Sequence, residues 1–168
     1  MHELVIIFAK YLVGVPVLVL AVIFFRLKQQ RRLAFATFLV ASAIVTVLLA
    51  KVAAALHQDP RPFVRDGVTP YFAHGRDNGF PSDHTTYSAL IAFVVLRYNK
   101  WLGAALAVLS LAIGSARVIA GIHHGQDIIG GFVVAALGVA VGYLLTVAAK
   151  SLYSRPNHTE ATKGSDSL

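Results

Sequence analysis

The chain has 168 residues, of which 57% are hydrophobic and only 14% are charged, and it contains no cysteine. Without cysteine there is no disulfide framework, no thiolate nucleophile and no cysteine-based metal site. The net charge of +7 could suggest nucleic-acid binding, but the basic residues stand mainly in short loops between apolar runs, which indicates membrane topology and no nucleic-acid partner.

Five apolar runs follow one another along the chain, and several reach the roughly 20 residues that a helix needs to cross a bilayer. The first, Leu4–Phe25, contains Lys10 and Pro16, which a membrane helix packed against neighbours tolerates. A basic cluster follows this run instead of preceding it, so the run is not a cleavable signal peptide. The remaining runs are Leu33–Leu56, His84–Tyr98, Trp101–Ile119 and Ile128–Ala149.

These runs predict an all-α, polytopic transmembrane bundle of about five spanning helices. The run that starts at His84 is short and must take its first turn from the preceding stretch SDHTT. We expect one domain over residues 1–150 and a polar, disordered tail over residues 151–168. In the last run, small residues stand four apart, as Gly131/Ala135 and Gly138/Gly142, a spacing that predicts close helix contact within the bundle.

If all five runs span, their connections alternate between the two faces of the membrane. Arginine and lysine gather on one face, in the loop after the first run, in the third connection and in the tail. The positive-inside rule makes that face, and the C-terminus, cytoplasmic. The N-terminus and the two polar connections, His57–Asp83 and Ala120–Asp127, then lie outside.

The outer connections and the helix ends beside them carry the side chains suited to chemistry. Arginines offer planar forks of donors that fit phosphate oxygens, and a serine beside a proline-fixed turn adds a hydroxyl at an expected helix start. His123 and Asp127 stand four apart and so share one helix face, where the carboxylate can hold the imidazole in one tautomer. The candidates are Arg61, Ser82, His84, Arg117, His123 and Asp127.

Two histidines with separable duties, together with cationic donors, are typical of phosphoryl transfer through a covalent phosphohistidine. One imidazole attacks phosphorus and the other protonates the leaving oxygen, while arginines stabilise the charge on the equatorial oxygens. A zinc site is the main chemical alternative and would draw on His84, His123, His124 and Asp127. The neighbouring arginines oppose it, because they would repel a dication.

Three stretches resemble the signature motifs of the type 2 phosphatidic acid phosphatase superfamily of membrane lipid phosphatases: PRPF at Pro60, FPSDH at Phe80 and SARVIAGIHHGQDIIGG at Ser115. The resemblance covers roughly residues 45 to 135. Its second motif usually has glycine where this chain has Asp83. That variant, and the polar stretch before it, resemble the bacterial undecaprenyl diphosphate phosphatase subgroup.

The resemblance implies a role for each matching residue. It implies that His123 is the nucleophile, with Asp127 as its partner and His84 as the general acid. It also implies that Arg61, Ser82 and Arg117 hold the phosphate, and that no metal or other cofactor is needed. Asp83 could add to the phosphate site or only cap the third helix.

One departure concerns the first motif, in which the family has a lysine seven positions before the arginine of its Arg-Pro pair. Ala54 occupies that position here. Lys51 lies three residues earlier on the same helix face, so it could replace the missing cation, or it could only extend to the membrane interface. Arg65 and Arg76 are the other candidates for the missing charge.

The resemblance implies an enzyme of the bacterial plasma membrane whose site faces the outside. Its expected substrate is a polyprenyl diphosphate lipid: undecaprenyl diphosphate, cleaved to the monophosphate and inorganic phosphate. Phosphatidylglycerol phosphate, phosphatidic acid or another lipid phosphate is the alternative substrate. A non-catalytic membrane scaffold is the alternative class, supported by Ala54. The sequence does not indicate the oligomeric state.

Overall fold

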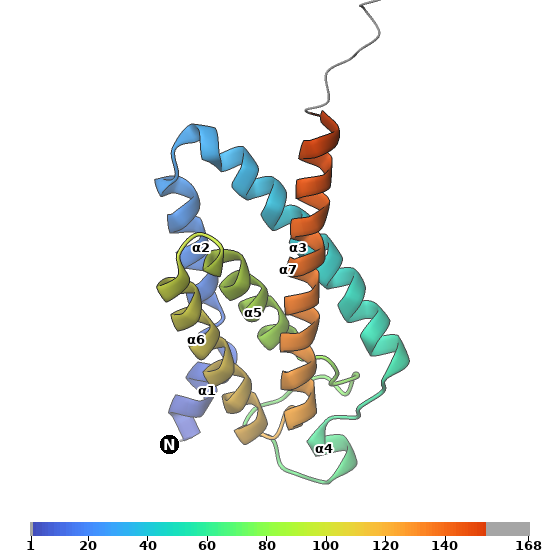
Figure 1. Ribbon diagram of the computed structural model, residues 1–168. Helices are drawn as coiled ribbons and strands as arrows, with labels where there is room; N and C mark the ends of the chain where they lie inside the picture. Colours follow the sequence, from blue (N-terminus) through green and yellow to red (C-terminus); the bar gives the residue numbers. More distant parts are fainter. Residues whose placement is uncertain (1, 154–168) are drawn as a thin grey trace, which may run out of the picture.

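The computed structural model describes residues 2–153 and shows a bundle of packed helices (Figure 1). In chain order they are α1 (His2–Lys10), α2 (Gly14–Arg26), α3 (Gln29–Leu56), α4 (Pro62–Arg65), α5 (Asp83–Leu96), α6 (Lys100–Ile119) and α7 (Gly125–Tyr153). No β-strand occurs within residues 2–153, so the predicted all-α class is confirmed. Residues 154–168 of the predicted tail lie outside the described residues, and α7 includes residues 151–153.

The first apolar run forms two helices instead of one. α1 and α2 are bent by 43° relative to each other at the short break after Lys10. Pro16 explains the break, because in a continuous helix its ring would clash with the carbonyl of Leu12. In the observed structure Pro16 lies in the first turn of α2, where backbone N–H groups have no helical partner in any case.

The structure does not confirm the expected five spanning helices. Among the described residues, α3, α6 and α7 are each long and apolar enough to cross a membrane, and the bent pair α1–α2 could supply a fourth. α5 has 14 residues, or about 21 Å at 1.5 Å per residue, against a hydrocarbon core of about 30 Å. It begins at Asp83, within SDHTT as expected.

α5 is the enclosed helix of the bundle. It contacts α2, α3, α6 and α7, and most of its residues are buried. Leu90 and Val94 of α5 pack against Phe35 and Phe38 of α3 in one apolar cluster. A helix covered by longer neighbours does not need to match the bilayer thickness.

The small residues of α7 form a close contact with α3. Gly138 faces Thr46 of α3, and Gly142 faces Ser42, with both polar side chains fully buried. A Cβ atom at Gly138 would overlap the Thr46 side chain. The predicted small-residue contact is therefore confirmed, and it forms between two helices of the same chain.

The two polar connections lie together at one end of the bundle, beside the N-terminus (Figure 1). Backbone hydrogen bonds join them: Tyr71 N–H donates to the Ala120 carbonyl at 3.0 Å, and Ser82 N–H donates to the Asp127 carbonyl at 3.1 Å. The turn between α2 and α3 and the C-terminal end of α7 lie at the opposite end. Which end faces the cytoplasm remains a prediction.

Replacing Gly138 by leucine should separate α3 from α7. Overpacking of a tight contact costs about 1–3 kcal/mol, so we expect a lower midpoint of thermal unfolding for the purified protein in detergent. Ala140→Leu adds similar bulk at an exposed position of the same helix and serves as the control. Equal midpoints for the two variants would contradict this account of the contact.

Candidate active site

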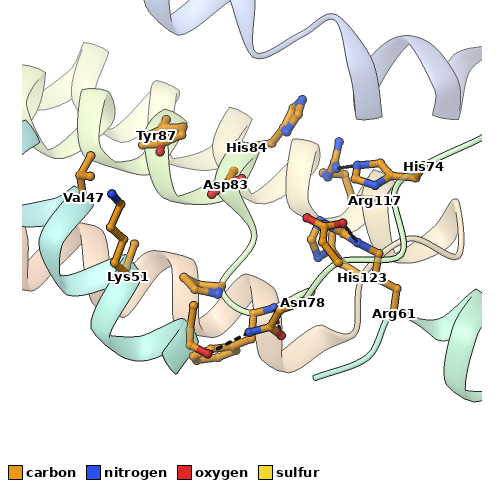
Figure 2. A pocket seen from close by; sticks show the side chains of 15 residues that line it. Val47, Lys51, Arg61, His74, Asn78, Asp83, His84, Tyr87, Arg117 and His123 are labelled. Carbon is orange, nitrogen blue, oxygen red and sulfur yellow. Dashed lines mark hydrogen bonds and ion pairs between the residues drawn. The ribbon is translucent and has the colours of Figure 1, made fainter. Parts of the chain in front are cut away.

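A cavity of about 390 Å³ opens at the end of the bundle where the polar connections meet. His84 reaches it from the first turn of α5, and His123 reaches it from the turn between α6 and α7. The two histidines expected to act together therefore line a single cavity. Figure 2 shows Lys51 on one side of this space and His123, Arg117 and His74 on the other.

His123 and Asp127 form a buried pair at the start of α7. Nδ1 of His123 lies 3.1 Å from Oδ2 of Asp127, and their side chains are 2% and 0% exposed. The backbone N–H of His124 also donates to Oδ2, at 2.8 Å. The spacing of four residues thus places the carboxylate against the ring, as the sequence predicts.

Contacts on both ring nitrogens determine the tautomer of His123. Nη1 of Arg61 lies 3.1 Å from Nε2, and because arginine can only donate, Nε2 must be the acceptor. Nδ1 therefore carries the hydrogen and donates it to Asp127. The lone pair of Nε2 is the one that faces Arg61.

The protonation of His123 follows from burial. Burial lowers the pKa of His123 below its ordinary value, the hydrogen bond to Asp127 opposes this, and the charges of Arg117 and Arg61 lower the pKa further. The net direction is downward, so the imidazole is neutral near pH 7. A neutral imidazole whose Nε2 carries no hydrogen has the form that a nucleophile requires, once Arg61 releases that nitrogen.

The two arginines of the cavity wall are nearly fully buried. Nε of Arg61 pairs with Oδ1 of Asp77 at 3.1 Å. Nη1 of Arg117 donates to the carbonyl of Ala9 in α1 at 2.8 Å, and Nη2 lies 3.1 Å from Nε2 of His74. Nε of Arg117 is buried and has no hydrogen-bond partner within residues 2–153. Such a donor is costly to leave unpaired, so the guanidinium of Arg117 is not fully satisfied by its neighbours.

The remaining predicted residues divide between the cavity and its surroundings. Lys51 and Asp83 line the cavity, as does Ala54. Ser82 is fully buried, is not part of the lining, and its Oγ accepts a hydrogen bond from Thr85 Oγ1 at 3.2 Å. It is the N-cap residue of α5 but makes no side-chain capping bond.

The structure also separates the three cations that could replace the missing lysine. Lys51 lines the cavity, whereas Arg65 and Arg76 do not. Arg65 instead pairs with Asp59 at 3.0 Å and with Asp66 at 2.8 Å. Lys51 is therefore the one of these three that is placed to meet a ligand.

A second polar cluster lies beside the cavity and is centred on Asp59. This buried carboxylate accepts hydrogen bonds from Arg65, from Nδ1 of His124 at 2.9 Å and from Gln126 at 2.6 Å. Burial alone would raise the pKa of Asp59, but the donors around it lower the pKa overall. The cluster joins the segment before α4 to the start of α7.

The metal alternative can be compared with this geometry. Within the described part of the chain, the group whose ligand atoms lie close enough to hold an ion is Asp59, His124 and Asp127, with atoms within 4.8 Å of one another. His84 and His123 are not members of it. Since Asp59 already binds the guanidinium of Arg65, a dication would have to displace that charge, and these residues fit a metal poorly.

The sequence assigns no role to three residues in or beside the cavity, His74, Asp77 and Asp59. His74 and Asp77 each hold one of the arginines, and Asp59 supports the helix start beside His123. A signal exists in the sequence, because HGRDNG is a dense polar stretch directly before FPSDH and Asp59 directly precedes PRPF. It does not say which partner each residue contacts.

Comparison with known proteins gives a consistent family match. The PAP2 superfamily matches residues 33–152. Undecaprenyl-diphosphatase BcrC of Bacillus subtilis (strain 168) is 37% identical over 86 residues, which are 51% of this chain and 43% of that protein. YbjG of Escherichia coli (strain K12) is 31% identical over 82% of this chain and 70% of its own length. Its name also contains the term undecaprenyl-diphosphatase.

A solved structure shares the fold. The first transmembrane PAP2-type phosphatidylglycerolphosphate phosphatase from Bacillus subtilis has a TM-score of 0.55 and 20% identity, and the match covers 92% of this chain and 78% of that one. The present chain spans about half the length of the first curated relatives that it matches.

The protonation state of His123 can be measured directly. We expect its imidazole to titrate below the ordinary value of 6.5 when followed by NMR against pH. Asp127→Asn should lower the pKa further, because the carboxylate favours the charged ring. Glu3→Gln, at an exposed position of α1, should leave the titration unchanged. An unchanged or raised pKa in Asp127→Asn would contradict the assigned pairing.

Proposed function

Because the chain belongs to the PAP2 superfamily, we propose that it is a membrane phosphatase that cleaves undecaprenyl diphosphate to undecaprenyl phosphate and inorganic phosphate. The observation that carries this proposal is the shared cavity. A carboxylate-paired histidine, a second histidine and two buried arginines line or adjoin one space, which is the set of groups that phosphohistidine chemistry requires. The proposed location is a bacterial plasma membrane, with the cavity on the outer face.

In the proposed first step, Nε2 of His123 attacks the terminal phosphorus and the bond to the bridging oxygen breaks. Arg61 now occupies Nε2, so its guanidinium must transfer its hydrogen bond to a phosphate oxygen as the substrate enters. Burial and the charge of Arg117 lower the pKa of His84 to about 4, so the negative charge of the bound diphosphate must first raise this pKa and let the ring take up a proton. His84 then gives that proton to the bridging oxygen, which leaves as the lipid monophosphate. Proton transfer of this kind contributes typically about 10²–10⁴-fold to the rate.

In the second step a water molecule attacks the phosphohistidine. His84, now unprotonated, takes a proton from this water, and His123 leaves as the neutral ring, so both histidines return to their starting state. Asp127 stabilises the positive charge that the His123 ring carries while phosphorylated. Arg61 and Arg117 stabilise the equatorial oxygens, and the loss of one such donor typically costs about 10²–10³-fold.

The position of Lys51 supports a diphosphate substrate. Lys51 and Ala54 both line the cavity from α3. Lys51 stands three residues before Ala54, so it lies about 4.5 Å further than Ala54 from the C-terminal end of that helix. In a prenyl diphosphate the second phosphate connects the reacting phosphorus to the lipid chain. A cation displaced toward the middle of the bilayer is therefore suited to that second phosphate.

Lipid monophosphates are the second candidate substrates, favoured by the fold shared with a phosphatidylglycerolphosphate phosphatase. A non-catalytic scaffold is the third candidate. One assay distinguishes the three candidates. It measures phosphate release by the purified protein, without added metal, from prenyl diphosphates, phosphatidylglycerol phosphate and phosphatidic acid. Absence of release from every lipid would favour the scaffold.

Replacing His123 by alanine removes the proposed nucleophile. We expect phosphate release from undecaprenyl diphosphate to become undetectable while the variant keeps the unfolding midpoint of the unaltered protein. Arg76→Ala is the matched control, because Arg76 is exposed and does not line the cavity. Substantial turnover by His123→Ala would refute the phosphohistidine mechanism.

Replacing Lys51 by alanine tests the substrate class. We expect KM for undecaprenyl diphosphate to rise about tenfold, the effect of one hydrogen bond to a charged group, with a smaller change for phosphatidic acid. Lys100→Ala, at the N-terminus of α6, is the control. An equal rise of KM for both lipids would mean that Lys51 contacts the reacting phosphate and does not select diphosphates.

A further inference from the structure

We propose that His74 is a positioning residue of this site, which holds the guanidinium of Arg117 at the cavity wall in the orientation that binds the phosphate. The inference rests on the proposed phosphate site and adds a third imidazole to it. His74 lines the cavity from the segment between α4 and α5. Its ring centre is 6.4 Å from that of His123.

The hydrogen bonds of His74 identify its role as an acceptor. Nε2 lies 3.1 Å from Nη2 of Arg117, which can only donate, so Nε2 accepts (Figure 2). Nδ1 then carries the hydrogen and faces the carbonyl of Gly75 at 3.4 Å. Burial and the charges of Arg61 and Arg117 lower the pKa of His74, which keeps the ring neutral and its acceptor nitrogen free.

Arg117 is held from two directions. Its Nη1 donates to the Ala9 carbonyl at 2.8 Å and its Nη2 donates to His74. Two acceptors on different nitrogens fix the plane of a guanidinium. With that plane fixed, the guanidinium keeps one orientation at the cavity wall, and the N–H groups that these two acceptors do not use remain for an incoming anion.

A neutral acceptor suits this position better than a carboxylate would. Arg61 is held by Asp77, whose side chain is 69% exposed and therefore well screened by water. Arg117 is only 2% exposed, so a carboxylate beside it would cancel its charge and repel phosphate at short range. An imidazole fixes the geometry of Arg117 and leaves its positive charge available.

The segment that carries His74 is anchored on both sides. Before it, Tyr71 N–H donates to the Ala120 carbonyl at 3.0 Å and the Tyr71 ring stacks on His2. After it, Gly79 N–H donates to the Asp59 carbonyl at 2.9 Å. These contacts hold the imidazole at a defined distance from α6, as a positioning role requires.

The test measures the binding of inorganic phosphate to the purified full-length protein by calorimetry, so it does not depend on turnover. His74→Ala should weaken phosphate binding about tenfold, the effect of one hydrogen bond to a charged group. His74→Gln should recover most of the affinity, because its amide oxygen can accept from Arg117. In an Arg117→Ala background, His74→Ala should cause no further loss.

Arg76→Ala, on the same segment, serves as the control and should bind phosphate normally. An equal loss from His74→Ala with and without Arg117 would overturn the positioning role, as would full affinity in His74→Ala. A lowered unfolding midpoint without recovery by His74→Gln would also overturn it, in favour of a purely structural role.

Two further results separate this inference from the proposed function. If the unaltered protein bound no phosphate, the anion site would be refuted, and the role of His74 with it. If it bound phosphate through Arg117 and His74 but released none from any lipid, the phosphatase proposal would fail while the positioning role stood.

Discussion

The buried carboxylate of Asp127 is the group on which the arrangement of the cavity depends. Its Oδ2 atom accepts hydrogen bonds from the His123 ring and from the His124 backbone, and its own carbonyl accepts from Ser82. Gly79 lies so close to Oδ2 that a Cβ there would stand 3.0 Å from it. One residue in the first turn of α7 thereby joins the turn after α6 to the start of α5. A buried carboxylate is costly without donors: Oδ2 has two, whereas Oδ1 is buried and has no partner within residues 2–153.

Much of the fold could be predicted from sequence, because a long run of apolar residues is most stable as a helix that is removed from water. All five runs are helical, and the short third run begins in the polar stretch that was expected to extend it. The count of spanning helices could not be predicted. Hydropathy measures how favourably a segment enters an apolar environment, but it does not distinguish lipid from other helices as that environment. The enclosed α5 therefore has the same apolar pattern as the helices around it.

The pair at the start of α7 was predictable because its members are close in sequence, and the motifs identified Arg61, Arg117 and His84 as well. The supporting residues were not, because their contacts join distant segments: His74 meets Arg117 across 43 positions. Among three cations near the first motif, spacing alone could not choose Lys51. That choice depends on which side chains face the cavity, and only the packing of α3 determines this.

The break in the first apolar run has a consequence for how this protein is divided into functional parts. In an unbroken helix the carbonyl of Ala9 would accept the N–H four residues later; here the helix ends at Lys10 and that oxygen binds Arg117 instead. The stretch that matches the family begins only at residue 33. The N-terminal helices α1 and α2 thus do more than add apolar surface, since the break between them frees a backbone oxygen that holds Arg117 at the cavity wall.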